Sequence, residues 1–392
     1  MVTRDGYDAV MRAVIQDIVR DHFGAYAETR KLPLRIRKAA RNITVCRTAE
    51  LGGHVLECPQ GHVRRIRYNS CRHRSCPTCS FLPTERWIHS QRARLPACDY
   101  YHVVFTMPWQ LHELWEHNRR EVTGLFFLAA WGSLKELLAD PKYLGALPGA
   151  VAAFQSWSQT LWLHPHLHVL VTGGGLTPDG RWVAARERFL LPARVLRDKF
   201  RGKFIAFLHR AVDADALALP GGMSVRHAHA RLGKLMRKKW HLMIMPPYAH
   251  GHGVVAYLGR YIRGGPISHR RVARVGRDTV RVSYRTPDRA RVERVALPAQ
   301  QFLGRLLRHV PPKGAHHIRS YGLFAPRCRA RLDLARLQLG QLPLADSPAP
   351  TWQDICSKAG PLHPERCPVC GNVLVLLPLL PPGPSPPNRR VA

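Results

Sequence analysis

The stretch WLHPHLHVLV, residues 162–171, places three histidines at alternate positions inside an apolar run. Alternation is the period of a β-strand, because successive side chains point to opposite faces of a sheet. His164, His166 and His168 therefore share one face, and the aliphatic residues between them point into a core. A lone histidine in such a run is usually only hydrogen bonded. His166 and His168 instead form a pair with the spacing needed to bind one metal ion.

The segments around this strand alternate between strand and helix patterns. Residues 100–108, YYHVVFTMP, are typical of a strand, and residues 110–139 of a helix. Residues 270–285, RRVARVGRDTVRVSYR, contain two alternating runs around a Gly-Arg-Asp turn, which predicts a hairpin. This mixture predicts an α+β fold. From about residue 375 the chain is rich in proline, and we expect disorder there.

Composition points to a polyanionic partner. The chain has 392 residues, 45% of them hydrophobic, so it can build a core and roughly two or three domains. It carries 60 lysines and arginines against 26 acidic residues, a formal net charge of +34. A GC-rich genome, which favours arginine, would account for part of this excess. Nucleic acid is the partner that such a charge favours.

The same composition argues against secretion and against a membrane partner. The first residues lack the apolar segment of a secretory leader, and no apolar run is long enough to span a bilayer. We therefore expect a cytoplasmic, nucleoid-associated protein. In that compartment ten cysteines indicate metal binding and not disulfides.

Five of the ten cysteines lie within residues 46–79. The candidate zinc ligands of this unit are Cys46, Cys58, His62, Cys71, Cys76 and Cys79. Structural zinc takes four nitrogen or sulfur ligands, usually as two close pairs. The two closest pairs, in CPQGH and CPTC, give an expected quartet of Cys58, His62, Cys76 and Cys79. Cys46 and Cys71 would replace one of these or help to hold a second ion.

Two further features accompany this unit. CPVC, at Cys367 and Cys370, is a second knuckle, for which Cys356 and His363 are the expected partners. Five arginines interleave with the zinc ligands, and they would contact DNA phosphates or form a solvated face. These arginines are Arg64, Arg65, Arg67, Arg72 and Arg74.

A pair of tyrosines lies downstream in AYLGRYIRG, residues 256–264. Tyr257 and Tyr261 are four apart, so on a helix their hydroxyls lie on one face. Such aromatic pairs usually pack in a core, but glycines and the arginines Arg260 and Arg263 surround this one. A phenol is a weak nucleophile at neutral pH, and a divalent ion that polarises a phosphodiester would compensate. Tyrosine, metal and a basic chain together indicate covalent DNA cleavage through a phosphotyrosine.

Four stretches carry a resemblance to a known family: SCRHRSCPTC, HPHLHVLVTGGGL, YLGRYIRGGPIS and RHVPPKGAHHIRSYGLF. Together they resemble the two-tyrosine HUH transposases of rolling-circle insertion sequences, which carry an N-terminal transposase zinc-binding domain. The resemblance covers roughly residues 10 to 330. It implies an HUH endonuclease fold, a central antiparallel sheet with flanking helices, preceded by a small zinc-binding domain. We expect a basic helical segment, a zinc-binding domain, a catalytic domain and a tail at residues 1–45, 46–95, 96–330 and 331–392.

The resemblance also implies the chemistry. His166 and His168 would bind Mg²⁺ or Mn²⁺, and one tyrosine would attack a single-stranded transposon end, giving a 5′-phosphotyrosine and a free 3′-OH. Single-stranded transposon ends and target DNA are the implied partners. Gln159, seven residues before His166, occupies the position of the third ligand in related replication initiators, with His164 as its rival. One departure concerns the zinc unit, where Gly61 replaces the usual second cysteine and the next residue, a histidine, would substitute.

Two other functions are compatible with parts of this pattern. A rolling-circle replication initiator or relaxase would share the histidine pair and the tyrosines. A non-catalytic, zinc-dependent nucleic-acid-binding protein would use the two tyrosines only for packing. The zinc unit ahead of the histidine strand and residues 308–324 after the tyrosines favour the transposase.

Overall fold

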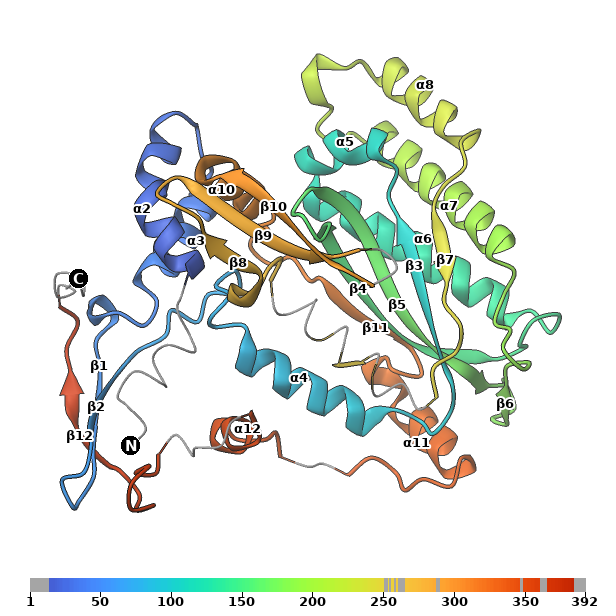
Figure 1. Cartoon of the computed structure of the whole chain (residues 1–392). Helices are drawn as coiled ribbons and strands as arrows, with labels where there is room; N and C mark the ends of the chain where they lie inside the picture. The colour runs from blue at the N-terminus through green and yellow to red at the C-terminus, as the bar shows by residue number, and fades with distance from the viewer. Residues whose placement is uncertain are drawn as a thin grey trace.

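The computed structural model describes residues 14–249, 253, 255, 256, 259, 265–286, 290–345, 348–359 and 365–383 (Figure 1). These residues combine helices with three antiparallel sheets, which confirms the α+β prediction. Short 3-10 turns connect several elements, at Ala49–Leu51, Trp109–Leu111, Pro220–Gly222, His269–Arg271 and Pro326–Cys328.

The largest sheet has the strand order β11-β4-β5-β3-β7, with the short β6 paired to β5. Its strands are β3 (Tyr100–Thr106), β4 (Leu147–Trp157), β5 (Leu163–Leu176), β6 (Trp182–Ala184), β7 (Leu242–Ile244) and β11 (Ile318–Gly322). The histidine stretch forms the first part of β5, which runs antiparallel to both of its main neighbours. The predicted central strand is therefore present, and its register places Gln155 of β4 opposite His166 and Val104 of β3 opposite His168.

One face of this sheet is the main hydrophobic core. Leu167, Val169 and Val171 of β5 are buried there. The helices that cover this face are α5 (His112–His117), α6 (Arg119–Ala139), α7 (Ala193–Asp213) and α8 (Val225–Met236) (Figure 1). Among the described helices, α6 has the length and apolar composition of a membrane span, but more than half of it is buried in this core. That burial is typical of a core helix in a globular domain.

The opposite face carries the histidines and a second, smaller cluster. Leu170 of β5 lies on this face, and it belongs to a cluster with Ile88 of α4 (Phe81–Arg94) and Leu332 of α11 (Arg329–Gln338). Val255 belongs to the same cluster. The side chains of His166 and His168 share this face because they are an even number of residues from Leu170.

A third cluster packs the N-terminal helices against residues 267–310. The helices α2 (Val14–Glu28) and α3 (Leu34–Val45) pack with α10 (Ala299–Arg308) and with the sheet of β8 (Val272–Arg274), β9 (Thr279–Arg285) and β10 (Val292–Pro298). The hairpin predicted at residues 270–285 is formed by β8 and β9. The described part of the N-terminal segment is thus a packed layer, and the domain boundaries given above stay a prediction.

The remaining sheet is a small ribbon in the order β12-β1-β2. It contains β1 (Gly53–Glu57), β2 (Arg64–Tyr68) and β12 (Val375–Leu380), and α12 (Trp352–Ala359) precedes β12 in the chain. The disorder expected from residue 375 is therefore wrong for Val375–Leu380, which pair with β1. β12 is an edge strand, and such strands tolerate proline because one of their sides forms no hydrogen bonds to a neighbouring strand; Pro378 lies there. Residues 384–392 lie outside the described residues.

Candidate active site and zinc centre

The histidine pair of β5 forms the centre of the candidate active site. Nε2 of His166 lies 3.0 Å from Nε2 of His168, and both side chains are buried. Nδ1 of His166 donates a hydrogen bond to the carbonyl oxygen of His164 at 2.6 Å. This bond selects the tautomer with a lone pair on Nε2, the one that a metal requires. Two lone pairs this close repel one another unless a proton or a cation lies between them.

A third buried imidazole, His102 of β3, completes the group. Its Nε2 lies 2.9 Å from Nδ1 of His168. When Nδ1 of His168 donates in this contact, the lone pair of His168 is on Nε2, directed at His166. Sequence reasoning did not select His102, because it is a single histidine in β3 and forms no repeat there.

The pair fits a divalent cation in charge and in geometry. Burial lowers the pKa of His166 to about 4 and places the pKa of His168 well below its usual value, so both imidazoles are neutral at physiological pH. Octahedral ligands at about 2.1 Å from Mg²⁺ place neighbouring ligand atoms about 3.0 Å apart. The observed separation of the two Nε2 atoms has this value.

Gln155 of β4 is the polar residue that the register places beside His166. It is buried, and its amide nitrogen has no hydrogen-bond partner among the described residues. Gln159 lies in the exposed turn after β4, where its side-chain oxygen accepts a hydrogen bond from the backbone of Arg285 at 3.0 Å. The structure therefore brings Gln155, and not Gln159, to the histidine pair. The exposed side chain of His164 has its ring centroid 5.0 Å from that of His166, and its role as the rival ligand stays a prediction.

The tyrosine motif is described only in part. Tyr257, Tyr261, Arg260 and Arg263 lie outside the described residues. Around them Gly253, Val255, Ala256 and Gly259 are helical, as the sequence predicted for this stretch.

These described neighbours place the motif's backbone. Val255 is buried in the cluster on the histidine face of the sheet. A Cβ added to Gly259 would lie only 2.3 Å from Cγ1 of Ile88, so the backbone at Gly259 packs directly on α4. A side chain at this position would force the segment away from α4. The described part of the tyrosine motif thus lies between α4 and the histidine face.

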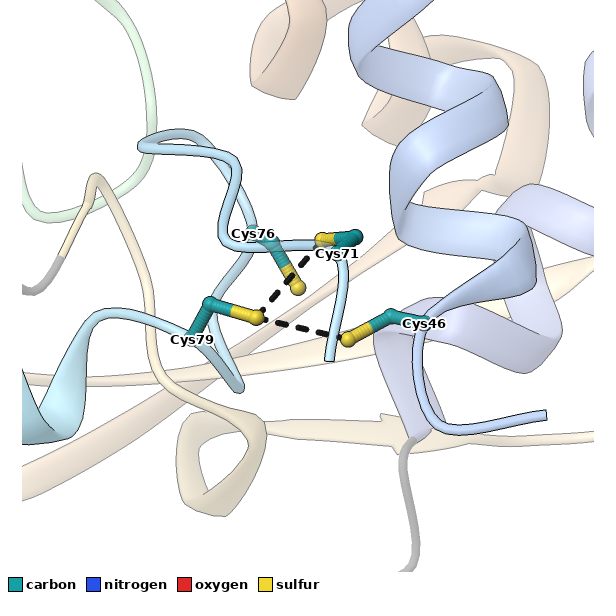
Figure 2. Close-up of side chains that lie close together, drawn as sticks. All are labelled: Cys46, Cys71, Cys76 and Cys79. Atoms are coloured by element: carbon teal, nitrogen blue, oxygen red, sulfur yellow. Dashed lines mark hydrogen bonds between the residues drawn. The ribbon is translucent and has the colours of Figure 1, made fainter. Parts of the chain in front are cut away.

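Four cysteines converge on a second centre, shown in Figure 2. Cys46 follows α3, and Cys71, Cys76 and Cys79 come from the loop before α4. Their sulfur atoms all lie within 4.8 Å of one another, with 3.4 Å between Cys46 and Cys79 and 3.6 Å between Cys71 and Cys79. Tetrahedral zinc with bonds of about 2.3 Å holds its sulfur ligands about 3.8 Å apart. The cluster therefore has the donors and the spacing of a structural zinc site.

The quartet expected from the sequence is wrong in its composition. Cys58 and His62 do not join this cluster but lie with Cys367 and Cys370 of the C-terminal segment. The physical reason is that Cys58 follows β1 at the far end of the ribbon, whereas the end of α3 brings Cys46 to the CPTC knuckle. Cys356 lies in α12 outside both clusters, and His363 lies outside the described residues.

The predicted DNA-binding arginines divide into two groups. Arg72 and Arg74 line a cavity of about 400 Å³ together with His316 and Pro311 of the loop that precedes β11. Arg74 also donates to the carbonyl oxygen of Ala315 at 2.8 Å, which fixes the cysteine loop against the loop that precedes β11. The remaining three are on β2, and the described contacts place Arg67 over the ring of Trp352 at 5.3 Å.

Comparison with known proteins adds the family. A family model described as "Putative transposase" matches residues 149–331, and one described as "Transposase zinc-binding domain" matches residues 18–107. The chain is 39% identical over 324 residues to the "Putative transposase y4qJ" of Sinorhizobium fredii (strain NBRC 101917 / NGR234), and the aligned region covers 80% of this chain and 81% of that protein. It is 29% identical over 348 residues to the "Transposase for insertion sequence element IS801" of Pseudomonas savastanoi pv. phaseolicola, and the aligned region covers 84% of this chain and 80% of that protein. No solved structure matches the chain significantly.

The matched ranges contain the features described above. Residues 149–331 hold the histidine strand and the tyrosine motif, and residues 18–107 hold the four-cysteine cluster. The cluster and the match to a zinc-binding domain together confirm the prediction of structural Zn²⁺. The chain belongs to the two-tyrosine transposases of rolling-circle insertion sequences that carry an N-terminal zinc-binding domain, and it is an enzyme that acts on DNA.

Proposed function

We propose that this transposase nicks and rejoins single-stranded transposon ends by metal-assisted tyrosine transesterification. The observation that carries the proposal is the buried pair of Nε2 atoms, 3.0 Å apart, on the sheet face that also buries Val255, the residue just before the tyrosine motif. A metal-binding pair and a nucleophile-bearing segment on one face are the two requirements of this chemistry.

His166, His168 and Gln155 are the residues that would hold Mg²⁺ or Mn²⁺. Gln155 takes the place that the sequence assigned to Gln159, because its amide is buried opposite His166 and can turn its oxygen toward the same ion. When bound, such an ion draws electron density from a phosphodiester oxygen and makes the phosphorus more electrophilic. By accepting a hydrogen bond from Nδ1 of His168, the side chain of His102 would hold that ring in the required tautomer.

Tyr257 and Tyr261 are the proposed nucleophiles. The phenolic oxygen of one loses its proton and forms a bond to phosphorus while the bond from phosphorus to the 3′ oxygen breaks, and the released 3′ oxygen takes up a proton, so that no proton is gained or lost overall. The product is a 5′-phosphotyrosine, whose bond energy is conserved, so a 3′-OH can later reverse the step without ATP. A second tyrosine allows a second cleavage before the first intermediate is resolved.

Exposed aromatic and basic groups supply a path for a single strand. Trp109 and Trp162 are 73% and 55% exposed, and they lie just beyond the ends of β3 and β5 nearest His166. Unstacked bases bind such platforms with little sequence preference. The cavity lined by Arg72 and Arg74 offers positive charge for the phosphates.

Covalent capture tests the proposed function directly. Purified protein is incubated with labelled oligonucleotides of candidate transposon ends, single-stranded or duplex, in Mg²⁺ or Mn²⁺, and the products are separated on a denaturing gel. We expect a covalent adduct with the single strand only. Tight binding without an adduct on every end would instead support the non-catalytic binder. An adduct that forms on replication origins but never joins two ends would support the initiator.

Replacing His102 by phenylalanine tests its positioning role. Loss of a group that orients a metal-binding histidine typically costs roughly 10- to 100-fold in metal affinity or activity, and we expect this range for His102→Phe. The Mn²⁺ concentration that gives half-maximal cleavage should rise, and His102→Gln, which still accepts a hydrogen bond, should restore part of it. His164→Ala is the matched control, because the hydrogen bond to His166 uses the backbone of His164. Equal metal requirements in His102→Phe and His164→Ala would contradict the role.

Substitution of Arg72 and Arg74 by glutamine tests the DNA path. We expect weaker binding of single-stranded DNA and a salt dependence whose slope falls by about 0.7 for each lost phosphate contact. Fluorescence anisotropy over a series of salt concentrations measures both quantities. Arg64→Gln with Arg65→Gln on β2 is the control, since these residues lie outside the cavity. A larger change of slope in the control than in the test pair would place the strand along the ribbon instead.

A further inference from the structure

The ribbon and the C-terminal knuckle meet at a second group of metal-binding side chains. Cys58, His62, Cys367 and Cys370 place their ligand atoms within 4.8 Å of one another. Sγ of Cys58 lies 3.6 Å from Sγ of Cys370 and 3.6 Å from Nδ1 of His62. Tetrahedral zinc would separate two sulfurs by about 3.8 Å and a sulfur and a nitrogen by about 3.6 Å.

We propose that these four residues form a second structural zinc site, which clasps the C-terminal segment to the N-terminal ribbon. Cys58 and Cys370 are 312 positions apart, so the ion would close most of the chain into one loop. Cys367 and Cys370 lie beyond both matched ranges, which end at residues 107 and 331. Cys58 and His62 lie inside the zinc-binding range, but none of the four residues belongs to the four-cysteine cluster.

The surrounding backbone is folded for such a site on both sides. In the ribbon, the N–H of Cys58 donates to the carbonyl of Val63, and that of Gly61 donates to the carbonyl of Cys58. In the C-terminal knuckle, Cys367 and Gly371 make the equivalent pair of bonds. Gly61 and Gly371 both have left-handed backbones, with φ of 73° and 74°, which lets each loop turn sharply behind its ligands.

The composition of the site selects zinc over the alternatives. Three thiolates and one imidazole are a common ligand set of structural zinc, whereas Mg²⁺ and Ca²⁺ prefer oxygen. A disulfide between Cys58 and Cys370 would not explain why the ligand atoms of Cys367 and His62 also lie close to the same point. A small apolar core, in which Leu56 and Leu374 are buried with Cys58 and Cys367, shields one side of the group.

The proposed clasp would hold more than its own ligands. After Cys370 the chain continues into β12, which pairs with β1 along its length. Upstream of the knuckle, α12 packs on α4, and the carbonyl of Pro350 accepts a hydrogen bond from Arg86 of α4 at 3.2 Å. α4 is the helix against which Gly259 packs. The site thus fixes the C-terminal segment along the helix that supports the tyrosine motif.

Zinc content of the full-length protein and its variants tests the proposal. Mass spectrometry of metal should find about two zinc ions per chain in the wild type and about one in Cys370→Ser. Cys79→Ser, in the four-cysteine cluster, is the matched control and should also retain about one zinc ion. Cys370→His, which keeps a zinc ligand, should restore the second ion. That result would show that the zinc lost from Cys370→Ser is not the consequence of a folding defect.

Limited proteolysis gives a second readout that does not depend on activity. Cys370→Ser should lose its C-terminal segment to protease much faster than the wild type, while Cys79→Ser should leave that segment protected. A wild type with one zinc ion, or Cys370→Ser with two, overturns the proposal. So does a C-terminal segment that stays equally protected in Cys370→Ser and the wild type.

Discussion

Replacement of both Tyr257 and Tyr261 by phenylalanine is expected to abolish the covalent adduct and to reduce strand cleavage at least roughly 1,000-fold, because the nucleophile is removed and no other covalent route remains. Binding of single-stranded DNA should change less than about threefold, since each substitution deletes one oxygen and leaves the ring. Denaturing gels measure the adduct, and peptide mass spectrometry of the wild type should locate the DNA on one of these two residues.

The single variants give the order of events. If one tyrosine always attacks first, its phenylalanine variant loses the first cleavage, and the other variant accumulates the first adduct without strand transfer. Tyr284→Phe is the matched control, because this tyrosine of β9 bonds to Glu293 and should leave cleavage unchanged. An adduct that persists in the double variant would assign the nucleophile to another residue. Both single variants acting as wild type would mean that the tyrosines are interchangeable.

The sequence predicted the histidine strand because alternation is a local property. The pattern in residues 162–171 already specified which side chains face the core, and β5 has that orientation. It could not select His102, whose partner His168 is 66 positions away on another strand. A single histidine in β3 has no repeat of its own to mark it.

The position of the proposed third ligand shows a related limit of the sequence. An offset of seven residues before His166 leads to Gln159 in the turn between β4 and β5. The antiparallel pairing of these two strands instead places Gln155 of β4 opposite His166. The register shifts between Gln155 and Trp157, so counting residues through the hairpin does not give the neighbour. Only the pairing of the strands identifies the amide that lies beside the histidine pair.

The zinc ligands show the same limit at longer range. Spacing correctly identified CPTC and CPQGH as close pairs, but it did not say that these pairs belong to different sites. The end of α3 brings Cys46 to one pair, and the C-terminal knuckle just before β12 brings Cys367 and Cys370 to the other. Each pairing depends on packing between elements far apart in the chain.

His166→Ala and His168→Ala are expected to have the second-largest effect, a loss of metal-dependent cleavage of at least roughly 100-fold. Each variant removes one of two neutral imidazoles directed at a common point. Single-stranded DNA binding measured without metal should stay within about threefold of the wild type, because both histidine side chains are buried, whereas the proposed DNA-binding tryptophans are exposed. Circular dichroism during heating checks that the sheet remains folded.

Metal binding itself separates this role from a structural one. In the Tyr257→Phe/Tyr261→Phe background, which cannot cleave, calorimetry should detect one Mn²⁺ site that is lost in His166→Ala and in His168→Ala. Gln155→Ala should weaken that site and Gln159→Ala should not, since Gln155 is the buried amide opposite His166 and Gln159 bonds to Arg285 in an exposed turn. The reverse result would return the third ligand to Gln159. Unchanged Mn²⁺ affinity in both histidine variants would place the metal away from β5. The Nε2 atoms of His166 and His168, 3.0 Å apart, would then share a hydrogen bond.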